Sequence, residues 1–300
     1  MKKAVAIGNF DAVHCGHFEL VQTARELVGS GGGVEIWSFD PPPVSILAPE
    51  VQVDRLTTFE QRSNLLIDAG ADKVRKIVPS REFLSKTPED FIAGVVEESS
   101  PDVFVEGEGF RFGKDRTGTA DTLRFIGERL GFSLVELGSV IVKLGDHSEV
   151  RASSSMVRTL LKNGRVEDAS IMLGREVQCS GIVTEGDQRG QAMGTPTANL
   201  TKIETMMPRD GIYAGTAIVD GETYIAAISI GTKPTFGKND RVLEAHLIAF
   251  DGVLHQYGWP LTVTISHWIR EQVTFDSIDA LRIQIESDIQ TTIKLIESNR

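Results

Sequence analysis

The sequence contains little cysteine, no long apolar run and less positive than negative charge. Its two cysteines, Cys15 and Cys179, have no metal-binding spacing, which argues against a disulfide framework and a structural zinc site. No apolar run approaches the roughly 18 residues of a membrane-spanning helix, so we expect no membrane association. The short apolar run near the N-terminus stops at Gly8, which predicts a first strand rather than a signal peptide. These features favour a cytoplasmic protein with free thiols.

The balance of charge is acidic, with 31 Lys and Arg against 42 Asp and Glu and a net charge of -11. Nucleic-acid affinity depends on clustered Lys and Arg, so this balance argues against a nucleic acid as the partner. Hydrophobic residues make up 41% of the 300 residues and charged residues 24%, as in ordinary globular proteins. The length suffices for two domains. We therefore expect a globular protein of two domains.

The first half of the chain alternates short apolar strands with amphipathic helices. Strands are expected at residues 5–7, 34–39, 73–78, 102–105 and 133–137. Helices are expected at residues 17–28, 59–69, 88–96 and 119–130. This alternation predicts an α/β, Rossmann-like domain, in which a parallel sheet has helices on both faces. Ligands of such sheets bind outside the carboxyl ends of the strands.

The second half has a different pattern. After a helical pair at 155–161 and 166–173, strands are expected at 177–183, 211–219, 224–230, 242–250 and 261–268. Because no helices separate these strands, they predict an antiparallel β-barrel, followed by a helix at 278–296. The change in pattern places the domain boundary near residues 170–176, with one domain over 1–173 and the other over 174–300.

The segment between the first strand and the first helix carries the clearest chemical motif. It reads Gly8-Asn9-Phe10-Asp11, followed by His14 and His17. Glycines allow the backbone to approach phosphates, and the helix N-terminus offers N–H groups and a positive dipole end to an anion. Two histidines three residues apart can stabilise charge on an α-phosphate and on a leaving pyrophosphate. A capped helix with a buried histidine is the structural alternative, and a zinc site lacks a convincing third ligand.

Three further segments suit nucleotide or ring binding, although each has an ordinary structural explanation. The hydroxyls of Ser154 and Ser155, with Arg158 one turn later, can surround phosphates or simply cap a helix. The segment 107–116 pairs aromatic rings with cations, which suits a flat ring and a phosphate. The Gly-rich segment 186–200 can cradle a nucleotide, and its Thr197 and Asn199 offer hard oxygens for Mg²⁺, or it is a plain barrel loop.

Across nearly its whole length the chain resembles the bacterial bifunctional riboflavin kinase/FAD synthetase family. The N-terminal resemblance rests on the motif from Gly8 to His17, on Phe39-Asp40-Pro41, on Phe110-Arg111-Phe112-Gly113 and on Ser153-Ser154-Ser155 with Arg158. The C-terminal resemblance rests on Gly194, Pro196-Thr197-Ala198-Asn199, Gly211-Ile212-Tyr213, the segment 230–236, Leu243-Glu244 with His246, and Phe275-Asp276-Ser277. The fold it implies is a Rossmann-like nucleotidyltransferase domain followed by a riboflavin-kinase barrel.

The resemblance also implies activities and roles. The chain would use ATP and Mg²⁺ to phosphorylate riboflavin to FMN and then adenylylate FMN to FAD with release of pyrophosphate. Catalytic roles fall to His14, His17 and the general base Glu244. ATP would contact Gly8, Asn9, Phe10, Asp11, Ser154, Ser155 and Arg158 in the first domain, and Gly186, Gly194, Thr197 and Asn199 in the second. Thr197 and Asn199 would also hold the metal, and the flavin would contact Phe39, Pro41, Phe110 and Arg111.

Several positions depart from the family pattern. In the first domain, Pro42 stands where the family usually has histidine, and Gly109 where it has Asp or Asn. In the second, the departures are Glu185, Gln191, Thr195, Ser229, Ala249 and Gln272. Two alternatives follow, namely a nucleotidyltransferase for another phosphate acceptor and a kinase half that binds flavin without turnover. Cys15 is expected to be a packing residue and not a nucleophile.

Overall fold

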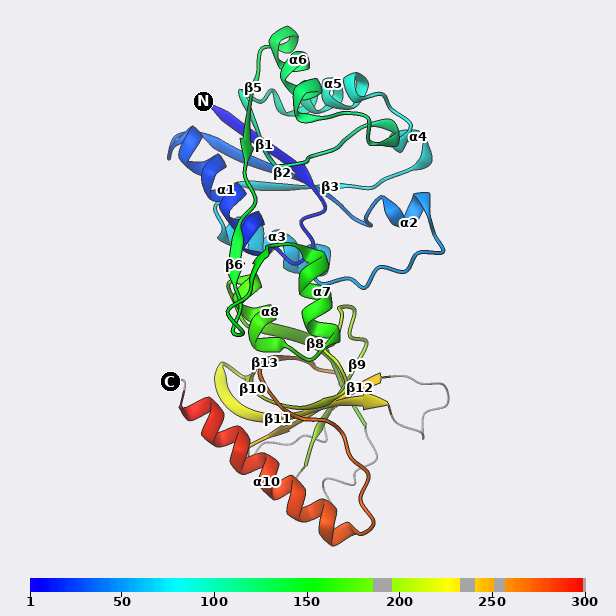
Figure 1. Ribbon diagram of the computed structural model, residues 1–300, viewed down its shortest axis with the longest axis vertical. Coiled ribbons are helices and arrows are strands. Elements are labelled where there is room, and N and C mark those ends of the chain that lie inside the picture. The colour runs from blue at the N-terminus through cyan, green and yellow to red at the C-terminus, as the bar shows by residue number, and fades with distance from the viewer. Residues whose placement is uncertain (186–195, 233–240, 251–256, 299–300) are drawn as a thin grey trace. The chain divides into compact units, whose positions relative to one another are not determined.

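Five short strands pair in parallel in the order β3-β2-β1-β4-β5 (Figure 1). They are β1 (Lys3–Gly8), β2 (Gly33–Phe39), β3 (Lys73–Ile77), β4 (Val103–Gly107) and β5 (Ser133–Leu137). The computed structural model describes residues 1–185, 196–232, 241–250 and 257–298. Contacts divide the chain into one unit of Met1–Val142 with Glu149–Ser154 and another of Lys143–Ser148 with Ser155–Arg300.

Helices cover both faces of the parallel sheet, as the alternation predicted. The helices of this unit are α1 (Cys15–Val28), α2 (Val44–Leu47), α3 (Phe59–Asp68), α4 (Arg81–Leu84), α5 (Pro88–Ser99) and α6 (Ala120–Leu130), with a 3₁₀ turn at Lys114–Arg116. Alternate residues of β1 face opposite layers: Ala6 packs with Leu66 of α3, whereas Val5 packs with Ile92 of α5. Two apolar cores therefore hold the sheet between its helices.

The strand order places a topological switch point between β1 and β4. From β1 the chain continues through β2 to β3 on one side, then crosses to β4 and β5 on the other. The pairing of β1 with β2 extends from Lys3 to Gly8, whereas its pairing with β4 covers Ala4 and Val5. The two strands therefore separate toward their carboxyl ends, where ligands of open α/β sheets bind.

The second unit is a closed barrel of six strands in the order β10-β11-β12-β9-β8-β13. Its strands are β8 (Val177–Thr184), β9 (Ala198–Thr201), β10 (Gly211–Val219), β11 (Glu222–Thr232), β12 (Arg241–Leu247) and β13 (Pro260–Arg270). Every second residue of β12, namely Leu243, Ala245 and Leu247, is buried, as expected for a barrel wall. Gly215 lies so close to β13 that a Cβ atom there would meet the Thr264 carbonyl oxygen at 1.9 Å. The predicted antiparallel barrel is confirmed.

Three helices group with the barrel: α7 (Ser154–Lys162), α8 (Val166–Leu173) and α10 (Ile278–Glu297). Helix α8 packs on β8 and β13, and α10 on β10, β11 and β13. The expected domain boundary after residue 173 assigned α7 and α8 to the first domain, whereas the contacts group α8, and α7 from Ser155 onward, with the second unit. The boundary between the two activities stays a prediction.

The sequence patterns missed the shortest elements. These are β9, the helices α2 and α4, and the two-stranded sheet of β6 (Ile141–Lys143) and β7 (Glu149–Arg151). Elements of three or four residues are too short to show a period. The strand expected at 242–250 ends at Leu247.

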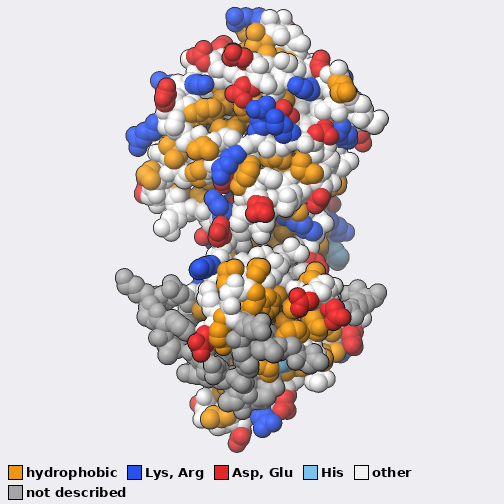
Figure 2. Space-filling view, turned by 180° about the vertical axis from the view of Figure 1, so that it is seen from behind, with side chains coloured by type: hydrophobic (Ala, Val, Ile, Leu, Met, Phe, Trp, Pro, Cys, Tyr) orange, Lys and Arg blue, Asp and Glu red, His pale blue; other side chains and the backbone are white. Residues whose placement is uncertain are grey.

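Surface charge is mixed. On the face shown in Figure 2, Lys and Arg side chains are interspersed with Asp and Glu over the first unit. Within the residues that the structure describes, no helix is both long and apolar enough to cross a membrane.

Candidate active site

A pocket of about 900 Å³ lies in the first unit at the carboxyl ends of its strands. It is lined by residues that follow β1, β2, β4 and β5 and by the start of α1. Of the residues predicted from the sequence, it brings together Gly8, Asn9, Phe10, His14, His17, Phe39, Phe110 and Arg111. Nucleotide-motif and flavin-motif residues thus share one cavity.

The loop between β1 and α1 is tightly turned. Phe10, Ala12 and Val13 have φ angles of 50°, 79° and 45°, a region that L-residues seldom adopt. The Val13 amide donates a hydrogen bond to the Phe10 carbonyl at 3.1 Å, which closes the turn. Strained backbone of this kind occurs at ligand-binding sites, where the surrounding structure holds it in place.

The two histidines of the motif lie at the N-terminus of α1. Their rings stack with centroids 3.7 Å apart and planes 21° apart, and the Phe10 ring lies 5.1 Å from the His17 ring. Gly16 permits this arrangement, because a Cβ atom there would lie 3.2 Å from the His14 ring. The first turn of α1, which the structure describes in full, has no acidic side chain that would repel an anion. The helix end therefore combines N–H groups, its dipole and two imidazoles, a combination suited to an anion.

Asp11, predicted to contact ATP, holds the loop in place. Its carboxylate accepts hydrogen bonds from the Thr57 amide at 2.9 Å, the Thr57 hydroxyl at 3.0 Å and the Leu56 amide at 3.1 Å. The Ser154 hydroxyl donates to the Asp11 carbonyl at 2.6 Å. Neither Asp11, Ser154 nor Pro41 is among the residues that line the pocket.

The other predicted residues of the serine segment continue along α7. Ser155 is exposed and Arg158 half-buried, and both belong to the second unit. Their roles in binding ATP stay predictions.

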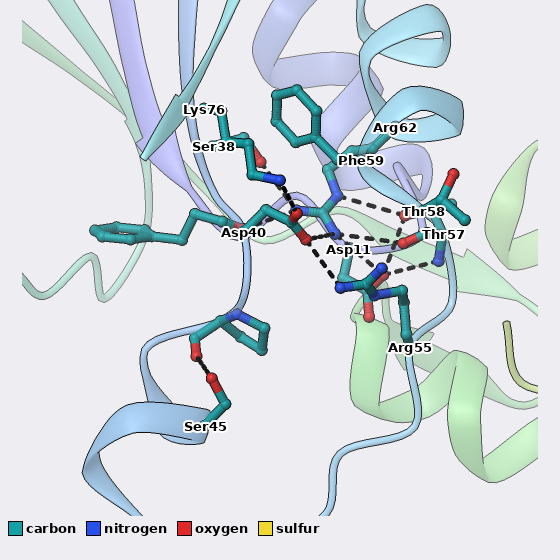
Figure 3. Close-up of polar contacts among 12 residues, drawn as sticks. Asp11, Ser38, Asp40, Ser45, Arg55, Thr57, Thr58, Phe59, Arg62 and Lys76 are labelled. Carbon is teal, nitrogen blue, oxygen red and sulfur yellow. Dashed lines mark hydrogen bonds and ion pairs between the residues drawn. The ribbon is translucent and has the colours of Figure 1, made fainter. Parts of the chain in front are cut away.

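A buried arginine that the sequence patterns missed supports the pocket wall (Figure 3). Arg62 of α3 is 2% exposed and donates hydrogen bonds to the Phe39 carbonyl at 2.9 Å and the Ser38 hydroxyl at 3.1 Å. It lies 3.9 Å from the carboxylates of both Asp11 and Asp40. Burial lowers the pKa of Arg62, and the two carboxylates oppose that shift. Its burial could have been predicted from its spacing, because Arg62 stands four residues before the apolar Leu66 and so lies on the same, inner face of the helix.

Asp40 is the centre of further ion pairs at the end of β2. Lys76 approaches its carboxylate to 2.5 Å and Arg55 to 3.2 Å, while Asp40 is itself 5% exposed (Figure 3). The peptide bond from Asp40 to Pro41 is cis. The network fixes the chain that follows Phe39, and so positions that pocket-lining ring.

Aromatic rings form a continuous wall on another side of the pocket. The successive pairs from Phe39 to Phe83, Phe91, Phe112 and Phe110 have centroid separations of 6.2, 5.7, 6.2 and 5.3 Å. The last two rings are stacked at 20°. The cations Arg111, Arg116 and Arg151 also line the pocket. A flat aromatic ligand with phosphate groups is chemically complementary to these surroundings.

A buried carboxyl, also missed from the sequence, lies in the pocket wall. Glu106 of β4 is 2% exposed, and its Oε1 accepts a hydrogen bond from the Ile7 amide at 2.8 Å. Burial raises the pKa of Glu106 well above its usual value, and the Ile7 hydrogen bond opposes that shift in part.

A second group of predicted residues meets on the barrel. Glu244 of β12 stands opposite Asn199 of β9 on one side and Ser229 of β11 on the other. Directly paired residues share a face of the sheet, so these three side chains form a row. The Gln272 amide donates to the Ser229 hydroxyl at 3.3 Å. Gly186 and Gly194, predicted to contact ATP, lie outside the described residues.

The row offers donors that suit Mg²⁺. Asn199 supplies an amide oxygen with Glu244 directly opposite it, and Thr197, two residues earlier, supplies a hydroxyl. Such hard oxygens, few in number, fit a Mg²⁺ ion held mainly by ATP phosphates and water. Within the described part of the chain, no three His, Cys, Asp or Glu side chains gather to hold a metal on their own.

Two protein families match the sequence. The FAD synthetase family matches residues 1–153, and the riboflavin kinase family matches residues 173–296. A bifunctional riboflavin kinase/FMN adenylyltransferase from Bacillus subtilis (strain 168) is 32% identical over 304 residues, covering 100% of this chain and 94% of that protein. A protein of the same name from Escherichia coli (strain K12) is 31% identical over 287 residues, covering 95% of this chain and 90% of its own.

A solved structure is also similar. It is described as a macrolide-efflux protein from Streptococcus pneumoniae and has a TM-score of 0.86 at 26% sequence identity. The match covers 97% of this chain and 93% of that one.

Proposed function

Because the chain belongs to the bifunctional riboflavin kinase/FMN adenylyltransferase family, we propose that it phosphorylates riboflavin to FMN and adenylylates FMN to FAD. ATP is the donor in both reactions, and Mg²⁺ accompanies it. The acceptors are small molecules, and neither a nucleic acid nor a membrane takes part. Cys15 and Cys179 are present as thiols, which fits work in a reducing cytoplasm.

The pocket of the first unit carries the adenylylation. The observation that supports this most is the stacked pair of His14 and His17 at a helix N-terminus, beside an aromatic wall. A phosphate oxygen of FMN attacks the α-phosphorus of ATP, the bond to the β-phosphate oxygen breaks, and pyrophosphate leaves. The imidazoles and the α1 N–H groups stabilise the charge that develops on the phosphates.

The flavin and nucleotide contacts in this pocket follow from its walls. Phe39 and Phe110 face the isoalloxazine ring, and Arg111 faces the ribityl phosphate of FMN. Pro41, two residues after Phe39, would contact the flavin from the same segment. The backbone of Gly8, Asn9 and Phe10 approaches the nucleotide phosphates. Asp11 and Ser154 contribute through the loop they anchor. Ser155 and Arg158 follow Ser154 in the chain and would contact ATP, as the family resemblance implies.

The row on the barrel carries the kinase reaction. Glu244 accepts the proton of the riboflavin 5′-hydroxyl, whose oxygen attacks the γ-phosphorus of ATP as ADP leaves. Thr197 and Asn199 would hold the Mg²⁺ of Mg-ATP, and Gly186 and Gly194 the nucleotide. When bound, Mg²⁺ neutralises charge on the transferring phosphoryl group.

The test is a product analysis with two starting flavins. Purified protein with riboflavin and Mg-ATP should release FMN, then FAD, with ADP from the first step and pyrophosphate from the second. Supplied FMN should give FAD directly. Failure of the FMN reaction alone would mean that the pocket serves another phosphate acceptor. Failure of the riboflavin reaction alone would mean that the barrel binds flavin without turnover.

A further inference from the structure

Glu106 lies at the topological switch point of the sheet, where β1 and β4 separate toward their carboxyl ends. It stands two residues after Phe104, so its side chain is on the same face of β4, toward Val5 and Ile7. The pairing of β4 with β1 ends at Phe104, while its pairing with β5 continues to Gly107. The Glu106 carboxyl fills the gap and accepts the Ile7 N–H that the separated ladder leaves behind.

The surroundings of this carboxyl favour its neutral form. The side chain lies on the same face of the sheet as the apolar cluster that includes Ile7, Phe91 and Phe104. Within the described residues, Glu106 forms no ion pair. Burial raises its pKa well above the ordinary 4.5. A neutral carboxyl has an O–H donor as well as acceptors, whereas the Ile7 amide satisfies one acceptor alone. Buried donors are almost always hydrogen-bonded, and this one adjoins the pocket.

Charged groups around the pocket could also act on Glu106. On β5 the neighbouring residue is Glu136, which pairs with Arg124 of α6. The other ionisable residues that line the cavity are His14, His17, Glu19, Glu108, Arg111, Asp115, Arg116 and Arg151. The two histidines stack on each other at the α1 end, and Glu108, Arg111, Asp115, Arg116 and Arg151 are exposed. None of these groups forms an ion pair with Glu106 in the described structure.

We propose that Glu106, in its neutral form, holds the hydrogen-bonding edge of a substrate ring in this pocket. Its O–H donates to a ring acceptor while its carbonyl oxygen accepts from the adjacent ring or exocyclic N–H. This inference rests on the proposed adenylylation. Two substrates present that edge, namely the adenine of ATP, through its amino group and a ring nitrogen, and the isoalloxazine of FMN, through its imide N–H and a carbonyl. An ionised carboxylate accepts only and does not match either edge.

The test compares Glu106→Gln with Glu106→Val in the FAD-forming reaction. The Gln side chain has the length of Glu and keeps both a donor and an acceptor, so the KM values of Glu106→Gln for ATP and FMN should stay within about threefold of those of the original enzyme. Val removes both, so one KM should rise by about tenfold or more, as for a lost buried hydrogen bond. The substrate whose KM rises identifies the ring. Glu136→Gln, on the adjacent strand outside the pocket lining, should change neither KM.

A urea titration of each preparation, followed by circular dichroism, reports whether the first unit is folded, and the original enzyme's FAD formation reports separately whether the proposed function holds. A second measurement does not depend on Val. In the original enzyme the KM of either ATP or FMN should rise with pH as Glu106 ionises, and the same KM should stay flat in Glu106→Gln. Unchanged KM values in folded Glu106→Val would overturn the proposal, as would a Gln variant as impaired as Val or an equal pH profile in both proteins.

Discussion

The imidazole rings of His14 and His17 stack at the first turn of α1 with their centroids 3.7 Å apart. Residues three apart on a helix are neighbours on one face, and Gly16 between them leaves room for the contact. Both rings therefore face the same pocket and can act on one group of phosphates.

Replacement of either histidine by alanine should suppress FAD formation by about 10²–10³-fold, the usual cost of removing one donor that stabilises transition-state charge. FMN formation should be unchanged, because that reaction uses the barrel. Both rates are measured on one preparation by chromatography of the flavins. His147→Asn, at an exposed turn, is the control and should affect neither rate. Loss of both activities in a folded variant would contradict independent sites.

Glu244→Gln should lower kcat for FMN formation by about 10²–10⁴-fold, because Gln has the size of Glu without its basicity. ATP binding and FAD formation from supplied FMN should persist, since Thr197, Asn199 and the first unit are unaltered. Glu222→Gln, an exposed carboxylate at the start of β11, is the matched control. An unchanged rate of FMN formation would remove Glu244 from the mechanism.

A fragment of residues 143–300 should fold alone and be more stable than one of residues 174–300. The longer fragment keeps α8, whose Val166, Ala169 and Met172 are fully buried. Burying side chains as large as Val and Met contributes about 1.5–3 kcal/mol each. Urea titrations of both fragments measure the difference, and any riboflavin kinase activity should remain in the longer one. Equal stability would mean that α8 adds nothing to the barrel.

Arg62→Leu should destabilise the first unit by on the order of 3 kcal/mol, because it leaves Asp11 and Asp40 with fewer partners in a buried site. Calorimetry should show the melting transition of the first unit shifted to lower temperature. Arg129→Leu, on the exposed part of α6, should shift it little. A similar effect from both substitutions would show that burial of Arg62 adds nothing to stability.

The raised pKa of Glu106 predicts a pH dependence of stability. Above the ordinary value of 4.5 the unfolded chain loses this proton, while the folded chain keeps it up to its higher pKa. Within that window the unfolding free energy should fall as pH rises, by up to about 1.4 kcal/mol per pH unit, and Glu106→Gln should lack this contribution. The quantity to compare is the difference between the two proteins in urea titrations between about pH 5 and pH 8. A difference that stays constant would show that Glu106 is ionised when folded.

Most of the architecture could be predicted because it is encoded locally. The pattern at 133–137 predicted the bounds of β5, and the pattern after residue 176 predicted a barrel. The motif from Gly8 to His17 was visible because its residues are close in the chain, and the structure places most of them in one pocket.

The sequence by itself determined the two kinds of sheet, the helices that cover the first sheet, and the short motifs at the ends of strands, since periodicity and spacing record which side of each element is buried. Only the tertiary structure decided that Asp11 bonds to Thr57, that Arg62 bridges Asp11 and Asp40, and that Glu106 reaches the Ile7 amide. These partners are separated by 22 to 99 residues along the chain, and they meet only in the folded structure. A local pattern shows that a polar group is buried, but its partner depends on which distant strand or helix is packed beside it.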